Sequence, residues 1–237
     1  MLLNFTFAAI VLLISTVTCV PWVPEPRNDP NWLAQHQSYV QTTINSNGTI
    51  RAIFLGASIT DWWPDDLFLR HFSTYGAVNY GISGDGVEHA FWRIQNGEVD
   101  GLQDSLKLIV FADCGSNSAG SYNAEEISRG YTATLNWIRQ ALPNTRVLLI
   151  GLMPRDNNFT DRWIRLTDVN IRISKWQDQA NPGTSPVRYL DLWTHFSREW
   201  GVVEPNLFLD DQLHLTREGY EKWVDVINPL FREMMGV

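Results

Sequence analysis

A serine, an aspartate and a histidine, the side chains of a nucleophilic catalytic triad, stand in turns between predicted elements of the chain. Ser58 follows a short apolar run, 51–55, directly after Gly56 and Ala57. A serine at such a strand-to-helix turn exposes its hydroxyl, and its backbone N–H lies near a helix N-terminus, whose partial positive charge suits an oxyanion. Taken alone, the position is better explained by an N-capping serine.

Asp211 and His214 stand together just before the last predicted helix. The histidine can take a proton from Ser58, while the aspartate orients the imidazole and stabilises its charged form. Three residues of separation let both side chains reach one region from a single loop. The alternative is that His214 merely precedes a helix capped by Thr216. The other histidines lack such a setting and are expected to be structural or solvent-facing: His36, His71, His89 and His195.

Two further residues supply hydrogen-bond donors for a developing negative charge. Gly84 lies in a glycine-rich stretch, 81–86, where the backbone can approach a ligand closely. Asn117 follows a buried apolar run, and its amide can donate to the same oxyanion. The alternatives are an ordinary glycine-rich turn and an asparagine that satisfies its own loop. The stretch is not a dinucleotide-binding fingerprint, because no acidic residue ends a second strand about twenty residues later.

The elements that must position these residues alternate between strand and helix. Continuous apolar runs separated by helical stretches predict an α/β domain whose parallel sheet is covered on both faces. Functional groups then gather at the carboxyl ends of the strands. Asn28 or Asp29 before Pro30 marks the start of a leading helix. We expect strands at 51–55, 77–80, 106–112, 147–152 and 187–192, and helices at 65–72, 87–95, 124–142, 168–179 and 217–231.

The order of these signals resembles the SGNH, or GDSL-type, hydrolase superfamily: serine after the first strand, glycine after the second, asparagine after the third, then Asp-x-x-His. Within it, the chain looks like the catalytic subunits of the intracellular platelet-activating-factor acetylhydrolases. The resemblance spans roughly residues 50–231 and is tightest in four segments: Asn79 to Asp85, Phe91 to Glu98, Gly151 to Arg155 and Leu213 to Tyr220.

The resemblance implies a three-layer α/β/α, flavodoxin-like domain with a five-stranded parallel sheet. It implies that Ser58 is the nucleophile, His214 the general base and Asp211 the orienting acid. Gly84, Asn117 and the N–H of Ser58 would form the oxyanion hole. The implied reaction is hydrolysis of a carboxylic ester through an acyl-enzyme, without a metal ion or other cofactor. A short acyl group, foremost acetyl, follows from the resemblance alone.

The chain departs from this family in two ways. The family's Gly-Asp-Ser is here Gly56-Ala57-Ser58, so the aspartate that would support neighbouring loops by hydrogen bonds is missing. We expect activity to be retained, in reduced or altered form if Ala57 matters. The second departure is the compartment, since the acetylhydrolases that the chain resembles are cytosolic, whereas this chain is expected to be secreted. Their regulatory partner is therefore not carried over, and pairing of two copies into a homodimer stays open.

The N-terminus predicts secretion. Residues 2–20 carry no charged side chain and contain an apolar run, 8–14, followed by small residues. We interpret residues 1–19 as a signal peptide cut after Cys19. A membrane anchor is the alternative, but the stretch is short and diluted by Ser and Thr. Residues 20–237 then form a single hydrolase domain, of which 20–50 are an extension with the leading helix. Asn47 and Asn158 head glycosylation sequons.

Composition narrows the classes of partner. With 26 acidic and 18 basic residues the net charge is −8, which argues against a nucleic-acid binder and against docking on anionic lipid. Two cysteines exclude a disulfide-dense scaffold, and Cys114, the one left after cleavage, is expected to be a small buried residue. The 11 tryptophans are unusual. Trp62 and Trp63 could line an acyl or sugar pocket, but packing of the first helix on the sheet is favoured for both.

The leading hypothesis is a secreted serine esterase that acts on a small ester, such as an acetylated lipid. A carbohydrate acetyl esterase acting on acetylated glycans is the first alternative, consistent with secretion and many tryptophans. The second is a secreted binding protein of the same fold that lost activity with the aspartate replaced by Ala57. The retention of Ser58, Asp211 and His214 argues against it, because a protein free of catalytic selection could lose all three.

Overall fold

Five parallel strands form the centre of the molecule. The computed structural model describes residues 20–156, 160–178, 180–181 and 183–237. The strands lie in the order β2-β1-β3-β4-β5, and every neighbouring pair is parallel. All five predicted strands are therefore confirmed, the polar 77–80 segment included. Their bounds are β1 Ala52–Gly56, β2 Ala77–Gly81, β3 Leu108–Phe111, β4 Arg146–Ile150 and β5 Val187–Leu190.

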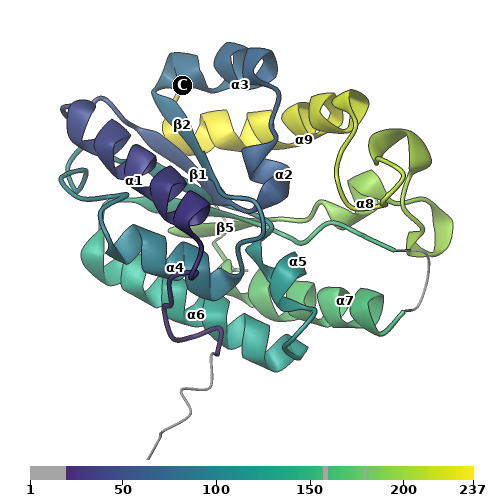
Figure 1. Ribbon diagram of the computed structural model, residues 1–237. Helices are drawn as coiled ribbons and strands as arrows, with labels where there is room; N and C mark the ends of the chain where they lie inside the picture. Colours follow the sequence, from purple (N-terminus) through teal and green to yellow (C-terminus); the bar gives the residue numbers. More distant parts are fainter. Residues whose placement is uncertain (1–19, 157–159, 179, 182) are drawn as a thin grey trace, which may run out of the picture.

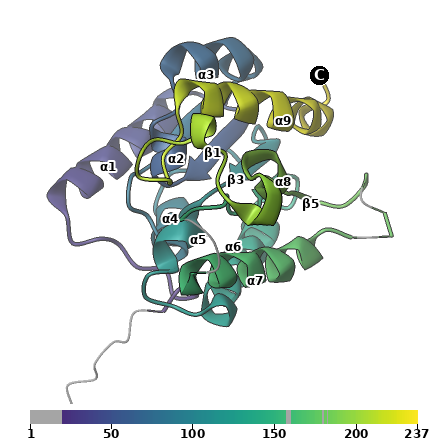
Figure 2. The same ribbon diagram turned by 90° about the vertical axis from the view of Figure 1, so that its right-hand side faces the viewer.

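Helices cover both faces of the sheet, as expected for apolar parallel strands. Figures 1 and 2 show α3 and α9 on one side of the sheet and α4, α6 and α7 on the other, with α1 beside the β2 edge. The three-layer α/β/α prediction is thus confirmed. The helices are α1 Pro30–Asn45, α2 Ser58–Asp61, α3 Asp65–His71, α4 Val87–Gln95, α5 Cys114–Ser118, α6 Ala124–Ala141, α7 Asp161–Ile173, α8 Trp193–Phe196 and α9 Arg217–Met235. Short 3-10 turns lie at η1 Ser73–Tyr75, η2 Ser174–Trp176, η3 Glu199–Gly201 and η4 Pro205–Leu207.

Alternation along the strands divides the core into two clusters. Ile53 and Leu55 of β1 face the α4–α6–α7 layer, whereas Phe54 faces the α3–α9 layer. On the α3–α9 side, Trp63 stacks on Trp223 at a ring-centroid distance of 4.2 Å. Burying rings of this size contributes much of the hydrophobic stabilisation of such a layer, so part of the tryptophan excess is core.

Local signals explain where most helices begin. The predicted leading helix is confirmed, because the Asp29 carboxylate accepts a hydrogen bond from the N–H of Asn31 at 2.9 Å and Pro30 stands in the first turn. The prediction for 168–179 is wrong at both ends. Thr160 caps the N–H of Trp163, so α7 starts at Asp161, and a 3-10 turn follows Ile173. Of the short helices, α2 is the turn of helix expected after Ser58, whereas α5 and α8 were not predicted, because four or five residues carry no periodic signal.

Some sequence predictions fall outside the described residues. The signal peptide, residues 1–19, and the sequon at Asn158 are among them. Asn47 is described and lies exposed in the turn after α1. Within the described residues, no helix combines the length and apolar character that crossing a membrane would require.

Candidate active site

Ser58, His214 and Asp211 form one hydrogen-bonded chain, although Ser58 and His214 are 156 residues apart. The His214 Nε2 lies 3.0 Å from the Ser58 Oγ, and the His214 Nδ1 lies 2.6 Å from the Asp211 Oδ2. Both distances are within hydrogen-bond reach, and the two ring nitrogens face different partners. The three residues singled out from the sequence are therefore brought together in the order that proton transfer from the serine requires.

A tight loop places the acid beside the base. The Asp211 Oδ1 accepts hydrogen bonds from the N–H groups of Leu213 and His214, at 3.0 and 2.9 Å. Partial burial raises the pKa of Asp211, but the hydrogen bonds from His214 and these N–H groups outweigh it and hold the pKa below its usual value. Asp211 is thus a carboxylate at neutral pH, with one oxygen shaping the loop and the other facing the imidazole.

Ser58 begins α2, directly after β1. Its side chain is nearly buried, and residue exposure is 7%. Helix α2 is anchored to α9 because the hydroxyl of Tyr220 donates to the carbonyl of Ile59 at 2.9 Å. Within the described chain, the N–H of Ser58 donates to no backbone or side-chain acceptor. It is therefore available to an oxyanion formed at the nucleophile.

The two other predicted donors flank Ser58 at the ends of β2 and β3. Gly84 has φ 84°, a left-handed backbone conformation that favours glycine. Among the described residues, no acceptor is bonded to its N–H. The Asn117 Nδ2 donates to the carbonyl of Asp85 at 3.0 Å, which fixes the amide and leaves its second hydrogen free. This arrangement can offer three N–H donors to one oxygen.

A buried charge network, formed by Arg93, Asp85, Glu98 and His36, lies beneath the Gly84 loop. The Arg93 guanidinium is fully buried and contacts the Asp85 Oδ2 at 2.8 Å and both Glu98 carboxylate oxygens at 2.9 Å. The His36 Nδ1 lies 3.0 Å from the Glu98 Oε1. Burial raises the pKa of Asp85 to about 6, against the attraction of Arg93.

Sequence reasoning assigned no chemistry to this network. The signal was present in the segment 91–98, which carries an arginine and a glutamate on either side of a predicted helix end. Arg93 also donates to the carbonyls of Tyr80, next to last in β2, and Gly56, the last residue of β1. The network therefore fixes the strand ends from which both Ser58 and Gly84 emerge.

Asp61 supports a loop beside the nucleophile, a task that the sequence analysis connected with the missing aspartate at position 57. Ala57 is fully buried and offers no hydrogen bond from its side chain. Asp61, three residues after Ser58, accepts from the N–H of Ser83 at 3.1 Å and from the Ser83 hydroxyl, and Gln35 donates to its other oxygen at 3.0 Å. The Gly84 loop is therefore tied to α2 by a carboxylate that sequence reasoning missed.

A second carboxyl lies under the nucleophile turn. Asp113, at the end of β3, has φ 60° and is 6% exposed. Burial raises its pKa to about 7, while Arg155 and the N–H of Ile59 favour the charged form. The Arg155 Nη1 donates to the Ser116 hydroxyl at 3.1 Å, one residue before Asn117. Asp113 and Arg155 thus place a negative and a positive group on the side of the active site formed by the ends of β3 and β4.

The structure separates Trp62 from Trp63. Packing on the sheet is confirmed for Trp63, which is 2% exposed. It is wrong for Trp62, which is 50% exposed and stacks on the ring of His214. Adjacent residues face different sides of a helix, so only one of the two could enter the core. Cys114 is fully buried as expected, and burial raises the pKa of its thiol, which argues against a second nucleophile.

A small polar hollow adjoins the oxyanion donors. It has a volume of about 300 Å³, and Gly84 and Asn117 form part of its wall. Glu88, a buried carboxyl in the wall, accepts from the Ser118 hydroxyl at 3.3 Å, and burial raises its pKa. Further polar side chains complete the lining, namely His89, Ser121 and Tyr122. A ligand here would meet hydroxyl, carboxyl and imidazole groups.

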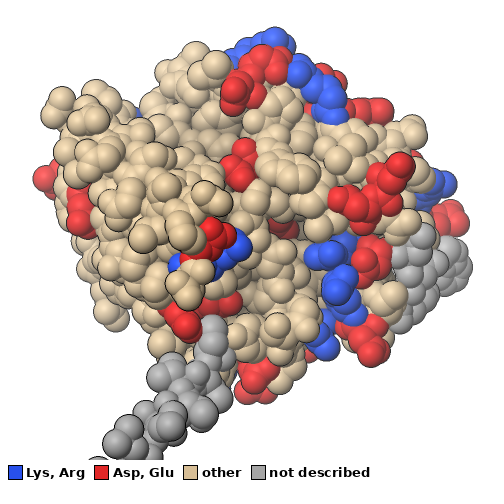
Figure 3. All heavy atoms as spheres, viewed as in Figure 1, with Lys and Arg blue, Asp and Glu red and all other residues tan. Residues whose placement is uncertain are grey.

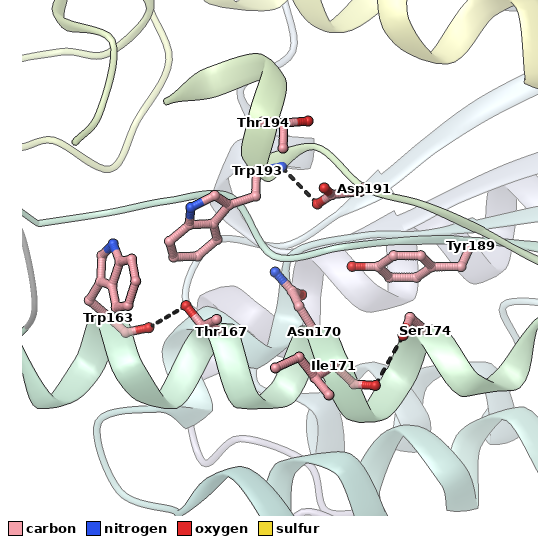
Figure 4. Close-up of a pocket in the computed structure, with 9 residues that line it drawn as sticks. All are labelled: Trp163, Thr167, Asn170, Ile171, Ser174, Tyr189, Asp191, Trp193 and Thr194. Atoms are coloured by element: carbon pink, nitrogen blue, oxygen red, sulfur yellow. Dashed lines mark hydrogen bonds between the residues drawn. The ribbon is translucent and has the colours of Figure 1, made fainter. Parts of the chain in front are cut away.

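A second cleft, of about 330 Å³, lies along the β5 edge and shares no lining residue with the triad. Figure 4 shows it between α7 and the β5–α8 segment, with the indoles of Trp163 and Trp193 and the ring of Tyr189 around it. On the face drawn in Figure 3, acidic and basic side chains lie beside one another, and no extended area of one sign is seen. Within the described residues no cluster of three or more His, Cys, Asp or Glu side chains is arranged to hold a metal ion.

Comparison with known proteins places this geometry in a family. The sequence profile of the GDSL-like lipase/acylhydrolase family matches residues 54–222. Human platelet-activating factor acetylhydrolase IB subunit alpha1 is 27% identical over 199 residues, covering 84% of this chain and 81% of the human protein.

Solved structures share the fold. A GDSL-like lipase from Bacteroides thetaiotaomicron aligns with a TM-score of 0.70 at 20% identity, over 84% of this chain and 98% of that one. A carbohydrate esterase family 3 protein from Talaromyces cellulolyticus aligns with a TM-score of 0.58 at 22% identity, over 79% of this chain and 98% of that one. At these identities the structural likeness supports the fold alone.

Proposed function

The chain belongs to the GDSL-like lipase/acylhydrolase family, and from this premise we propose that it hydrolyses short-chain carboxylic esters, acetyl esters foremost, through an acyl-enzyme on Ser58. The observation that carries the proposal is the hydrogen-bonded chain from Ser58 through His214 to Asp211. It provides a nucleophile, a base within reach of it and a carboxylate that sets the tautomer of the base.

The first half of the reaction acylates the serine. His214 Nε2 takes the hydroxyl proton while Ser58 Oγ bonds to the ester carbonyl carbon, whose oxygen becomes an oxyanion. The N–H groups of Ser58 and Gly84 and the Asn117 amide donate to that oxygen, which stabilises the tetrahedral species in a site already ordered to receive it. The imidazolium then gives its proton to the departing alkoxide as the C–O bond breaks.

The second half repeats these steps with water. His214 takes a proton from water, the hydroxide oxygen bonds to the acyl carbon, and the oxyanion occupies the same donors. Collapse breaks the bond to Ser58 Oγ, which recovers its proton from the imidazolium. The product is the free carboxylic acid, and the enzyme returns to its starting protonation state.

The alcohol portion of the substrate is open to two candidates. The names of the relatives include platelet-activating factor acetylhydrolase, which favours an acetylated lipid. The polar hollow beside Gly84 and Asn117 favours a carbohydrate, because its hydroxyl and carboxyl groups would hydrogen-bond a polyhydroxylated alcohol better than an alkyl chain. The fold is shared with a carbohydrate esterase and with an acetyl esterase mutant that holds an acetate ion, so this second candidate is compatible with the fold.

We also propose that the protein is secreted and glycosylated at Asn47. The uncharged apolar stretch within residues 1–19 supports secretion, and the exposed position of Asn47 makes it accessible to glycosylation. Expression in a secreting host tests both. Release into the medium with a new N-terminus at Val20, and a mass loss on deglycosylation that Asn47→Gln abolishes, are the expected results.

Comparison of the wild type with Ser58→Ala tests the catalytic proposal. Wild type should hydrolyse p-nitrophenyl acetate and be labelled by a fluorophosphonate, and the variant should do neither while keeping its melting temperature. Absence of both signals in wild type would leave a binding protein as the better reading. A panel of acetylated phospholipid analogues and acetylated glycans then separates the two alcohols, with Glu88→Gln expected to weaken glycan turnover only.

A further inference from the structure

Trp62 stands out among the tryptophans of the described chain by its exposure. Among the tryptophans whose side chains the structure describes, it alone is exposed, at 50%. Its ring stacks on the imidazole of His214 with a centroid distance of 4.0 Å and an interplanar angle of 22°. Leaving half of a large apolar ring in water forgoes much of the stabilisation that burial would give, so core packing does not account for this placement.

The turn that presents the nucleophile also presents this ring. The N–H of Trp62 donates to the carbonyl of Ser58 at 2.9 Å, which closes the single turn of α2. Residues four apart lie on one face of a helix, so the hydroxyl of Ser58 and the indole of Trp62 both meet His214. Trp63, one position on, instead enters the core.

Hydrogen bonds hold the edge of the imidazole but not its face. Asp211 and Ser58 bind the two nitrogens in the plane of the ring. Side-chain exposure is 48% for Asp211 and 14% for His214, so water reaches the carboxylate far more than the ring. The indole therefore covers a ring face that an exposed aspartate on a surface loop leaves open.

We propose that Trp62 is a positioning residue, which keeps the imidazole of His214 in the plane needed for proton transfer and stabilises its protonated form. The inference rests on the proposed esterase function. When Nε2 accepts the proton of Ser58, the positive imidazolium lies against the negative face of the indole, a favourable cation–π arrangement. Water screens the attraction between the imidazolium and the half-exposed Asp211. The indole therefore contributes a larger part of the stabilisation of the imidazolium.

The same stack suits the second proton transfer. Nε2 must move from the oxygen of Ser58 to the leaving oxygen, a small shift within the ring plane. A stacked ring can slide in its plane while tilting is resisted. Loss of the stack should therefore slow esters with poor leaving groups, which need protonation, more than p-nitrophenyl acetate, which does not.

The test compares Trp62→Phe, Trp62→Leu and wild type on p-nitrophenyl acetate and on an unactivated alkyl acetate. We expect Trp62→Leu to lower kcat roughly threefold on the first ester and roughly tenfold on the second, with KM within about twofold of wild type, and Trp62→Phe to recover most of the loss. Trp176→Leu is the matched control, because its indole contacts Thr132 in another part of the chain, and its kinetics should be those of wild type.

A direct readout of the stack accompanies the kinetics. With five histidines in the chain, the ring protons of His214 can be assigned by NMR with His214→Gln. We expect an upfield ring-current shift in wild type and in Trp62→Phe that is lost in Trp62→Leu. Unchanged kinetics in Trp62→Leu, or equal loss in the Phe and Leu variants, would overturn the positioning role. A wild type without hydrolysis or fluorophosphonate labelling would overturn the esterase function itself.

Discussion

The two sides of the active site are built in opposite ways. On the oxyanion side, Gly84 stands over a charge network in which Arg93, Asp85 and Glu98 have fully buried side chains. On the base side, His214 is held by Asp211, which is half exposed, and by the exposed indole of Trp62. One side is fixed by the interior of the protein and the other by contacts at its surface.

This difference matches what each side does in the proposed reaction. An oxyanion hole works best when its donors are already in place, because reorganisation during the reaction would cost free energy. The base must pass a proton between three oxygens, those of serine, leaving group and water, and a loop with short-range contacts allows small movements. Mutations in the buried charge network should therefore lower the stability of the fold, whereas mutations on the base side should lower turnover with little effect on stability.

Arg93→Met should cause the largest loss of stability, because it removes the central cation of the buried charge network. The variant keeps the side-chain volume but removes the cation that bonds both Asp85 and Glu98, so that Asp85 keeps Arg27 at 4.0 Å and loses its direct hydrogen bond to a guanidinium. Breaking a buried ion pair in this way costs about 3–5 kcal/mol, which corresponds to a fall in Tm of roughly 6–20 °C for a chain of this size. Thermal unfolding by circular dichroism measures it, with Arg93→Lys expected to lose less. A Tm within about 3 °C of wild type would contradict the comparison.

Asp211→Asn makes the opposite change on the surface side. The amide cannot stabilise the imidazolium and favours the wrong tautomer of His214, so we expect kcat to fall roughly 10³-fold while Tm changes by less than about 2 °C. Steady-state hydrolysis of p-nitrophenyl acetate provides the measurement. Asp210→Asn, a change at an exposed neighbour, is the control and should keep full activity. A large drop in Tm for Asp211→Asn would show that the loop is part of the folding core.

The same contrast explains what the sequence could predict. The triad was found because serine, Asp-x-x-His and the strand ends form a pattern along the chain. Arg93 and Glu98 are five residues apart, but the contact of His36 with Glu98 could not be predicted, since these two residues are 62 positions apart and meet through the packing of α1. Asp61 and the exposure of Trp62 were missed because α2 is a single turn, too short for periodicity to show which side each residue faces.

The buried carboxyl of Asp113 makes the stability of the fold depend on pH. Burial raises its folded pKa to about 7, above the unfolded value near 3.8. The native state therefore binds a proton that the unfolded chain has released, and the contribution of Asp113 to stability falls as pH rises from about 4 to about 7. We expect Asp113→Asn to gain Tm over wild type at pH 8, by an amount that shrinks toward pH 4. Thermal melts across this range check the sign, and a pH-independent difference would refute it.

Asp61→Asn has the smallest expected effect. It tests whether the Gly84 loop is held in place by the buried charge network alone. Asp61 ties Ser83 to the helix of the nucleophile, and an amide would weaken these charge-assisted hydrogen bonds by about 1–2 kcal/mol. If the tie positions Gly84, kcat should fall roughly tenfold with KM for p-nitrophenyl acetate unchanged, since the oxyanion exists only in the transition state. Asp65→Asn, at an exposed carboxylate in α3, should match wild type. A normal kcat in Asp61→Asn would mean that the buried charges hold the loop unaided, and that no other carboxylate replaces the aspartate of the Gly-Asp-Ser motif where this chain has Ala57.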